Sequence, residues 1–171
     1  MINLQRIREA ILQGLRDYLR QSYADFLIIL ANPDAPEPDT MPFMTMDITS
    51  PFIPEGINHA ETTAASGDNL LITQSQNAKM SISFNVHSKS RDESTDIALK
   101  AQEYFHCHGY EELQAKGVVV AESYGLQNRE GYIGDSWERW IGFDFVFRVY
   151  GYTQKQQDRI VTADVTGTVT T

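Results

Sequence analysis

Apolar and polar side chains alternate most strictly in two stretches of the chain, residues 79–87 and 140–150. Because side chains alternate between the two faces of a β-strand, each stretch predicts a strand with one buried face. The apolar set of the second stretch is Ile141, Phe143, Phe145, Phe147 and Val149. We expect these side chains to point into the core, with Asp144 and Arg148 on the opposite face.

Two helices are expected beside these strands. Residues 3–22 carry apolar side chains at helical spacing, while the arginines lie off that stripe. Further along, Ser90 and Glu93 form the S-x-x-E pattern of a capping box, which predicts the start of a second helix. Gly109 is well placed to end that helix.

Shorter apolar runs predict four more strands, at residues 26–30, 44–48, 70–73 and 118–123. All six prolines lie between residues 33 and 54, which favours an extended, rigid connection around the second of these strands. Residues 58–68 are small and polar and predict a mobile loop, and residues 75–77 predict a turn. The glycine-rich residues 125–136 predict a long hairpin loop that leads into the aromatic strand.

Together these elements predict an α+β fold, in which the N-terminal helix and the second helix pack against a mostly antiparallel sheet. A chain of 171 residues is typical of one domain, which we expect to span residues 1–153. Residues 154–171 are β-prone but weakly apolar. We expect them to be either disordered or an inter-subunit arm, a strand completed by a neighbour.

Charge and cysteine content narrow the classes of function. Acidic residues outnumber basic residues by 23 to 14, so the net charge is −9. Nucleic-acid affinity comes mainly from lysine and arginine at the phosphates, so DNA binding is not expected as the main activity. A single cysteine excludes an intramolecular disulfide and favours a reducing compartment. No apolar run approaches the ~18 residues of a membrane span, and charges interrupt the N-terminal apolar pattern, so we expect neither a membrane segment nor a signal peptide.

The residues most suggestive of chemistry are the adjacent His106, Cys107 and His108. Successive residues of a helix point about 100° apart, so these three cannot converge on one metal without distant ligands. Glu138 and Asp144 would lie ~20 Å apart on a strand, too far for paired-carboxylate hydrolysis. We therefore predict no catalytic, cofactor-binding or metal-binding residues, and a small metal-dependent enzyme is the weakest alternative.

Aromatic and arginine side chains gather in the glycine-rich hairpin and the strand that follows it. These residue types are enriched at the hot spots of protein interfaces. An internal corner of the fold, with Arg139 paired to a carboxylate, explains the same composition equally well. The candidate contacts with other subunits or partners are Arg129, Glu130, Tyr132, Trp137, Glu138, Arg139, Trp140, Arg148 and Tyr150.

Four stretches resemble the phage neck and tail terminator proteins, also called tail completion or head-to-tail joining proteins, and in particular their neck-terminator-like branch. The proline-rich residues 32–38 and the following 42–46 resemble that group's entry into its first long strand. Residues 81–104 resemble its strand followed by a capped helix. Residues 134–144, with the sequence GDSWERWIGFD, resemble its final strand and are the most specific of the four. The resemblance covers roughly residues 3–152.

The resemblance implies a structural virion protein without catalytic residues or cofactors. Such proteins form a hexameric ring at the phage neck, assembled in the host cytoplasm, that ends the tail tube. One face would contact the tail tube protein, with the sheath as a further candidate, and the other the head connector or stopper protein. DNA would pass through the lumen without specific binding. A head-completion or baseplate module of similar fold is the alternative.

Overall fold

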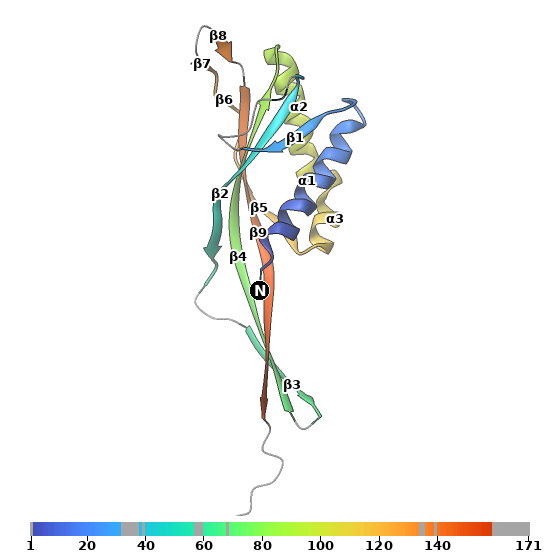
Figure 1. The fold of residues 1–171 in the computed structure, drawn as a ribbon, viewed down its shortest axis with the longest axis vertical. Helices are drawn as coiled ribbons and strands as arrows, with labels where there is room; N and C mark the ends of the chain where they lie inside the picture. Colours follow the sequence, from blue (N-terminus) through green and yellow to red (C-terminus); the bar gives the residue numbers. More distant parts are fainter. Residues whose placement is uncertain are drawn as a thin grey trace, which may run out of the picture.

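The computed structural model describes residues 2–31, 38, 40–56, 60–67, 69–133, 136–138 and 140–158; in 131–133 and 136–138 it describes the backbone. These residues form a seven-stranded, mostly antiparallel sheet with helices on one face, and a separate two-stranded hairpin (Figure 1). The predicted α+β fold with an N-terminal helix is confirmed. The helices are α1 Leu4–Arg20, α2 Arg91–Glu103 and α3 Tyr110–Ala115, with a π-helical turn, Tyr104–His108, between the last two. The strands are β1 Leu27–Leu30, β2 Phe43–Pro54, β3 Ala60–Ser66, β4 Asn69–His87, β5 Val118–Ser123, β6 Gln127–Asn128, β7 Gly131–Ile133, β8 Ser136–Glu138 and β9 Trp140–Asp158.

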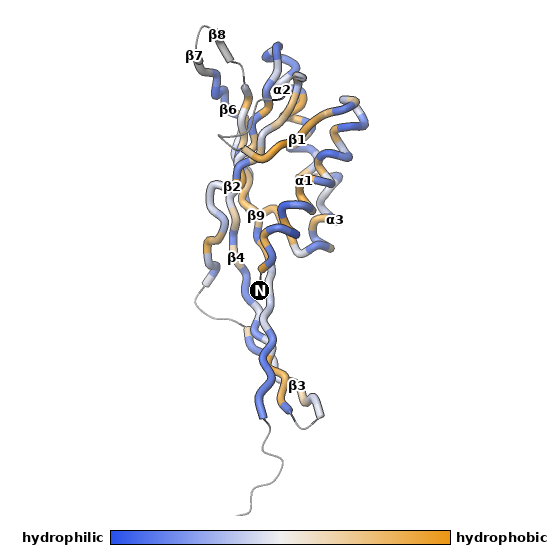
Figure 2. The backbone as a smooth tube through the Cα atoms, viewed as in Figure 1, coloured by the Kyte–Doolittle hydropathy of each residue, from blue (hydrophilic) through white to orange (hydrophobic). Residues whose placement is uncertain are grey.

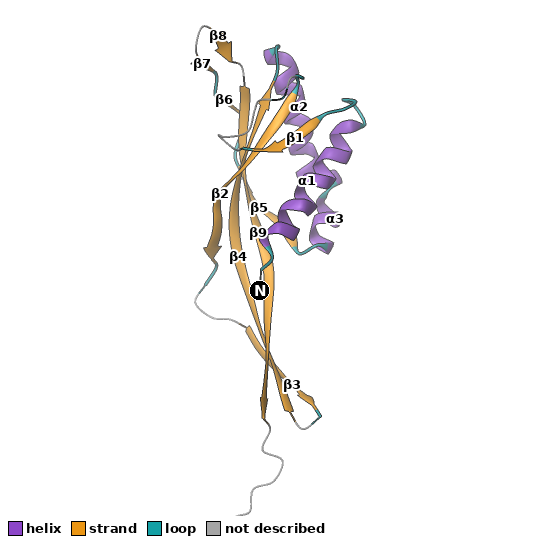
Figure 3. Cartoon of the chain, in the orientation of Figure 1, coloured by secondary structure: helices purple, strands orange, loops and turns teal. Residues whose placement is uncertain are grey.

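Two long strands, β4 and β9, form the spine of the sheet. They pair antiparallel without interruption, from Asn69 opposite Asp158 to His87 opposite Trp140. The main strand order is β1-β2-β4-β9-β5; β3 pairs with one end of β4 and β6 with the other end of β9. Only β1 and β2 pair in parallel. The helices cover one half of the sheet's length and leave the other half bare (Figure 3).

The predicted register of β9 is confirmed. Phe143, Phe145 and Phe147 have no exposed surface, whereas Asp144 and Arg148 bond with partners on the opposite face. Helix α1 begins where the Asn3 side chain accepts a hydrogen bond from the Arg6 amide at 3.0 Å. Its predicted apolar stripe is Leu4, Ile7, Ile11, Leu15 and Leu19; the last four are buried against the sheet, whereas Leu4 in the first turn is exposed. The core therefore lies between the helices and the helix-side face of the sheet.

The second helix begins at the predicted place, but the predicted capping box does not form. Ser90 occupies the N-cap of α2, yet its side chain makes no capping hydrogen bond. The Glu93 carboxylate accepts instead from the Ser88 hydroxyl, and the Ser90 amide donates to Ser88 Oγ at 3.1 Å. Ser88, two residues upstream, thus supplies the link that the sequence pattern assigned to Ser90.

Gly109 lies at the predicted place, as the C-cap of the π-helical turn that extends α2, but it does not stop the chain from continuing as a helix. The chain continues from α2 through the π-helical turn into α3, and Gly109 keeps a right-handed φ of −89°. Gly109 is small because the Tyr104 ring packs against its Cα, where a Cβ would clash with the ring. The helical run ends at Gly117, whose φ is +78°. Close packing therefore accounts for the first glycine, and the left-handed turn for the second.

Three predicted connections proved to contain strands. Residues 60–66 of the expected mobile loop form β3, and the expected turn at 75–77 lies inside the uninterrupted β4. The expected hairpin loop at 125–136 contains β6 and β7 and the first residue of β8. Residues 154–158, expected to be disordered or completed by a neighbour, are paired with β4 within the chain. The rest of that segment, residues 159–171, lies outside the described residues.

The bare half of the sheet projects beyond the helices as a narrow three-stranded ribbon (Figures 1 and 2). We call it the arm and define it as β3, residues 69–77 of β4 and residues 150–158 of β9. Every residue of β3 is exposed, and no buried residue occurs in the β4 part of the arm. In the β9 part of the arm only Gly151 is buried, at the base of the arm where Ile2 packs on it.

Candidate interaction surfaces

The structure separates the predicted contact residues into two groups, one near the start of β9 and one further along the strand. Trp140 lies at the start of the strand, and Arg148 and Tyr150 lie near the base of the arm. Trp140 and Tyr150 are ten positions apart along the strand, a span of ~33 Å. The sequence therefore predicted two distant surfaces as though they were one.

Five of the predicted residues lie in or beside the β7–β8 hairpin. Tyr132 belongs to β7, and Trp137 and Glu138 belong to β8, where the structure describes the backbone. Arg139 lies outside the described residues. Glu130, which leads into β7, is half-buried and makes an ion pair of 3.6 Å with Arg91 at the start of α2.

Arg129 is a structural link within the chain. Its guanidinium donates to Ser83 Oγ at 2.7 Å, to Asn85 Oδ1 at 2.8 Å and to Asp144 Oδ2 at 2.8 Å. The side chain lies directly over Gly142, where a Cβ would clash with it. Arg129 thus clamps the segment after β6 onto β4 and β9. A variant that removes it tests folding as well as surface contacts.

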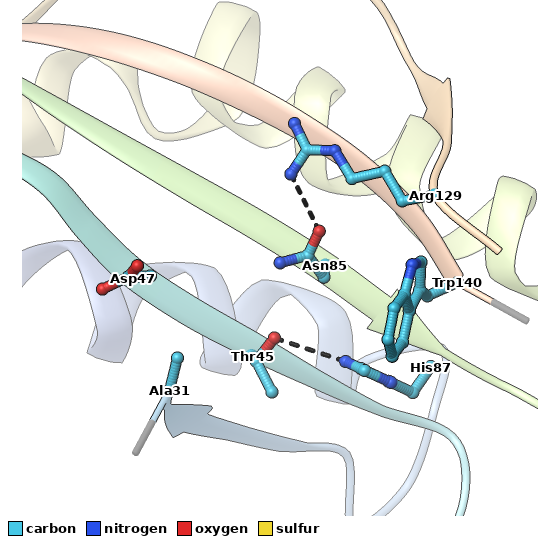
Figure 4. A pocket seen from close by; sticks show the side chains of 7 residues that line it. All are labelled: Ala31, Thr45, Asp47, Asn85, His87, Arg129 and Trp140. Atoms are coloured by element: carbon cyan, nitrogen blue, oxygen red, sulfur yellow. Dashed lines mark hydrogen bonds between the residues drawn. The ribbon is translucent and has the colours of Figure 1, made fainter. Parts of the chain in front are cut away.

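Next to this link, a cavity of about 800 Å³ opens on the sheet face away from the helices (Figure 4). His87 forms its aromatic wall: its ring stacks on Phe43 at 4.6 Å and meets the edge of Trp140 at 5.1 Å. His87 Nε2 lies 3.3 Å from Thr45 Oγ1. The residues that line the cavity are Ala31, Thr45, Asp47, Asn85, His87, Arg129 and Trp140. Trp140 is therefore half-buried in an internal aromatic cluster.

Burial lowers the pKa of His87 from its ordinary value of 6.5 to about 4. Between these two values the unfolded chain binds more protons than the folded chain, so folding stability falls as the pH falls. We expect a loss of about 1–2 kcal/mol between pH 6.5 and pH 4, reduced by the solvent exposure of this half-buried ring.

This pH dependence can be measured by urea unfolding at pH 7 and pH 4.5. His87→Phe keeps a ring on Phe43 but cannot titrate, so its stability should fall less with acid than that of the native chain. His106→Phe, at an exposed position, is the matched control and should keep the native pH dependence. Equal acid losses in the native chain and His87→Phe would contradict the assignment.

Arg148 also has its partner within the chain. Its guanidinium forms a two-pronged ion pair with Glu55, in which Nη2 lies 2.6 Å from Oε1 and Nε contacts Oε2. Lys79 continues the network to Glu122 at 2.8 Å and to Glu55 at 3.7 Å. The hydrogen bond from Arg148 lowers the pKa of Glu55, and that from Lys79 lowers the pKa of Glu122. This exposed network joins the end of β2 to β4, β5 and β9.

The adjacent histidines and cysteine lie on the π-helical turn and point to different neighbours. His106 packs on Phe145 with 5.4 Å between ring centroids, and His108 stacks on Tyr18 at 5.0 Å and lies 3.5 Å from Glu103 Oε1. Cys107 is exposed. Among the described residues, no three histidine, cysteine or acidic side chains are grouped closely enough to hold a metal.

The comparison with protein families finds a match over most of the chain. The family model described as phage neck terminator protein matches residues 9–171. The chain belongs to the phage neck terminator family. The match includes residues 154–171, which the sequence resemblance had left out. No curated protein matches the chain. Membership supports a structural role at the phage neck, in contact with other tail and head proteins. No helix in the described part of this family member is long and apolar enough to cross a membrane.

The surface of this family member that sequence reasoning missed is the arm. Its base carries Tyr150 and Tyr152, whose exposed fractions of 53% and 55% are the largest among the exposed large hydrophobic residues. The sequence did contain one signal for it. Gly67, with φ +63°, and Asp68 separate two stretches that pair in register from Ser66 opposite Asn69. A glycine followed by aspartate between two such stretches is typical of a tight hairpin turn.

Proposed function

We propose that the chain forms a hexameric ring at the top of the phage tail, where it terminates the tail tube and joins the tail to the head connector or stopper protein. The family match over residues 9–171 carries this proposal. The ring would contact the tail tube protein on one side, with the sheath as a further candidate. The family is structural, which favours a role without catalysis.

Two features of the fold support a closed ring. The helices bury one face of the sheet in the body, while the arm is uncovered on both faces within the described residues. A ring repeats one heterologous contact around an axis, so each copy can bury such surfaces without leaving an open end. We propose residues 1–153 as the ring-forming unit and residues 154–171 as a C-terminal segment that contacts a neighbouring subunit. Strand β9 runs across that boundary to Asp158.

The net charge of −9 suits passage of DNA through the ring. Phosphates are repelled by an acidic lumen and held by a basic one, so an acidic ring lets the duplex slide. The protein would therefore act as a conduit for DNA and form its specific contacts with proteins.

The β7–β8 hairpin is the proposed contact with the head-side or tail-side partner, because loops on rigid scaffolds commonly carry contacts. The sharpest variant is Glu130→Ala/Tyr132→Ala, which leaves the Arg129 clamp in place. Supplied to a phage whose own copy of the gene is deleted, it should yield separate heads and tails, with joined particles reduced at least tenfold. The exposed pair Gln13→Ala/Gln114→Ala in the helices is the matched control and should restore joining.

Electron microscopy of complete particles provides the decisive readout. We expect six copies of the chain at the junction of head and tail. Density for the protein at the baseplate, within the head shell or in a different copy number at the neck would overturn the proposal. Normal joining with the hairpin variant would show that the hairpin is not a contact with the partner. The proposed ring would then be tested by the electron microscopy density alone.

A further inference from the structure

The arm has two open edges, one on each side of the same stretch of β4. Residues 60–66 of β3 flank β4 on one side, opposite residues 69–75, and residues 152–158 of β9 flank the same stretch on the other. Within the described residues, no further strand pairs with residues 60–66 of β3 or with residues 153–158 of β9. Strand β5 reaches β9 only up to Val149, and β2 reaches β4 only down to Ala78.

Neither edge carries the usual protection against pairing. Native proteins commonly blunt an exposed edge with proline, a bulge, several lysines or a very short strand. The β3 edge, with the sequence AETTAAS, has no proline or lysine and pairs with β4 over seven residues without a register shift. The β9 edge, residues 153–158 with the sequence TQKQQD, has one lysine, Lys155, one aspartate at its end and no register shift. A partner that adds a strand requires an open edge without bulges, and the arm has two.

The two edges complement each other. Both β3 and β9 run antiparallel to β4, so they run in the same direction. A neighbour related by rotation about an axis along the arm would place its β3 beside β9 as a parallel pair. Glu61 is the only charged residue of the β3 edge, and on the same face of the sheet the β9 edge carries only Lys155. Glu61 is level with Thr153, and Lys155 is level with Thr63. The two opposite charges would therefore be diagonal neighbours, two residues apart, across such a contact.

We propose that the arms of neighbouring copies pair edge to edge, β9 of one copy with β3 of the next, and close into a continuous β-barrel. This inference rests on the proposed ring and identifies the contact that closes it. Each copy supplies one edge of each kind, so the contact is head-to-tail and pairs both edges of every arm.

The composition of the arm fits such a barrel. Three strands from each of six copies give 18 strands, a number at which membrane barrels enclose an aqueous channel. At a strand spacing of ~4.8 Å, the backbone diameter is roughly 27 Å without tilt and wider with tilt. The two outer strands of the arm consist largely of threonine, serine, alanine and glutamine, and the half-buried Leu70, Leu71 and Ile72 lie on the middle strand, β4 (Figure 2). The wall is therefore mostly polar on both sides.

Disulfide trapping tests this pairing in assembled particles. Ala64 and Gln156 lie at the same height, since both are opposite Leu71. We would combine Ala64→Cys and Gln156→Cys with Cys107→Ser, which removes the native thiol. Within one copy β4 separates the two positions by ~9.6 Å, beyond the ~7 Å that a disulfide can bridge. Any bond between them therefore joins two copies.

In purified particles under mild oxidation, we expect covalent multimers up to the hexamer from the double-cysteine chain. Barrel strands stagger, so Thr62→Cys and Ala60→Cys are each paired with Gln156→Cys to sample shifted registers on the same face. Each single-cysteine chain is a control and should stay monomeric on a denaturing gel. Dimers from a single-cysteine chain would indicate two-fold pairing of like edges and overturn the proposal.

A second variant tests the edge without cysteines. Thr62→Lys/Ala64→Lys places two charges on the exposed β3 edge and should reduce infectious particles at least a hundredfold, with the circular dichroism spectrum unchanged. Gln13→Lys/Gln114→Lys adds the same charge to exposed helix positions and should have no effect. A ring at the neck without arm cross-links in any register, or normal infectivity of the β3 variant, overturns edge pairing alone. Absence of the protein from the neck overturns the proposed function itself.

Discussion

Replacing Phe145 with alanine is expected to lower the free energy of unfolding by about 3–5 kcal/mol, the range found for large aromatic residues truncated in a core. Phe145 has no exposed surface, and its ring centroid lies 4.8 Å from that of Phe105 and 5.8 Å from those of Phe143 and Phe147. Alanine would leave a cavity between sheet and helices that this aromatic cluster cannot fill without distorting the long β4–β9 pairing.

Urea unfolding of the purified chain measures the effect. Tyr150→Ala, five residues further along the same strand and 53% exposed, is the matched control, with an expected change of no more than about 0.5 kcal/mol. A loss below about 1 kcal/mol for Phe145→Ala, or equal losses for the two variants, would contradict the burial of this side chain.

The sequence predicts the body of the fold well because burial imposes a period on it. The helix-side face of β9 and the stripe of α1 are apolar at every position that touches the core, so alternation and helical spacing revealed them. The arm has no such constraint. Its outer strand β3 is exposed at every residue, so small and polar residues suffice and residues 60–66 look like a loop, whereas the apolar run in its middle strand, β4, did predict a strand at residues 70–73. A strand held mainly by backbone pairing leaves little trace in hydrophobic periodicity.

The candidate contact residues show a second limit. Sequence composition indicated which side chains could form contacts, but not which of them have partners within the fold. Arg129 bonds with residues up to 46 positions away, and Arg148 pairs with Glu55 across 93 positions. Such pairings depend on the strand order β2-β4-β9, which alternation alone does not specify. Tyr150 differs, since its side chain is exposed and belongs to the arm.

Removing the Arg129 side chain is expected to cost about 2 kcal/mol of folding stability. Arg129→Ala leaves the oxygens of Ser83, Asn85 and Asp144 without their donor. The loss of the hydrogen bond costs most free energy at Asp144, because the other carboxylate oxygen, Oδ1, is already buried without a hydrogen-bond partner among the described residues. A fully buried pair would cost 3–5 kcal/mol when broken, but 24% of the Arg129 side chain and 37% of the Asp144 side chain are exposed.

A double-mutant cycle separates this link from general damage to the fold. Asp144→Ala removes the stranded carboxylate, so the double variant Arg129→Ala/Asp144→Ala should be less destabilised than the sum of the single variants, by about 1–2 kcal/mol. Gly142→Ala gives an independent check, since its methyl group displaces the Arg129 side chain while keeping the charge. It should destabilise the native chain but cost little in the Arg129→Ala background, where the methyl group has space. Additive losses in both cycles would mean that Arg129 does not clamp the β6 segment to the sheet.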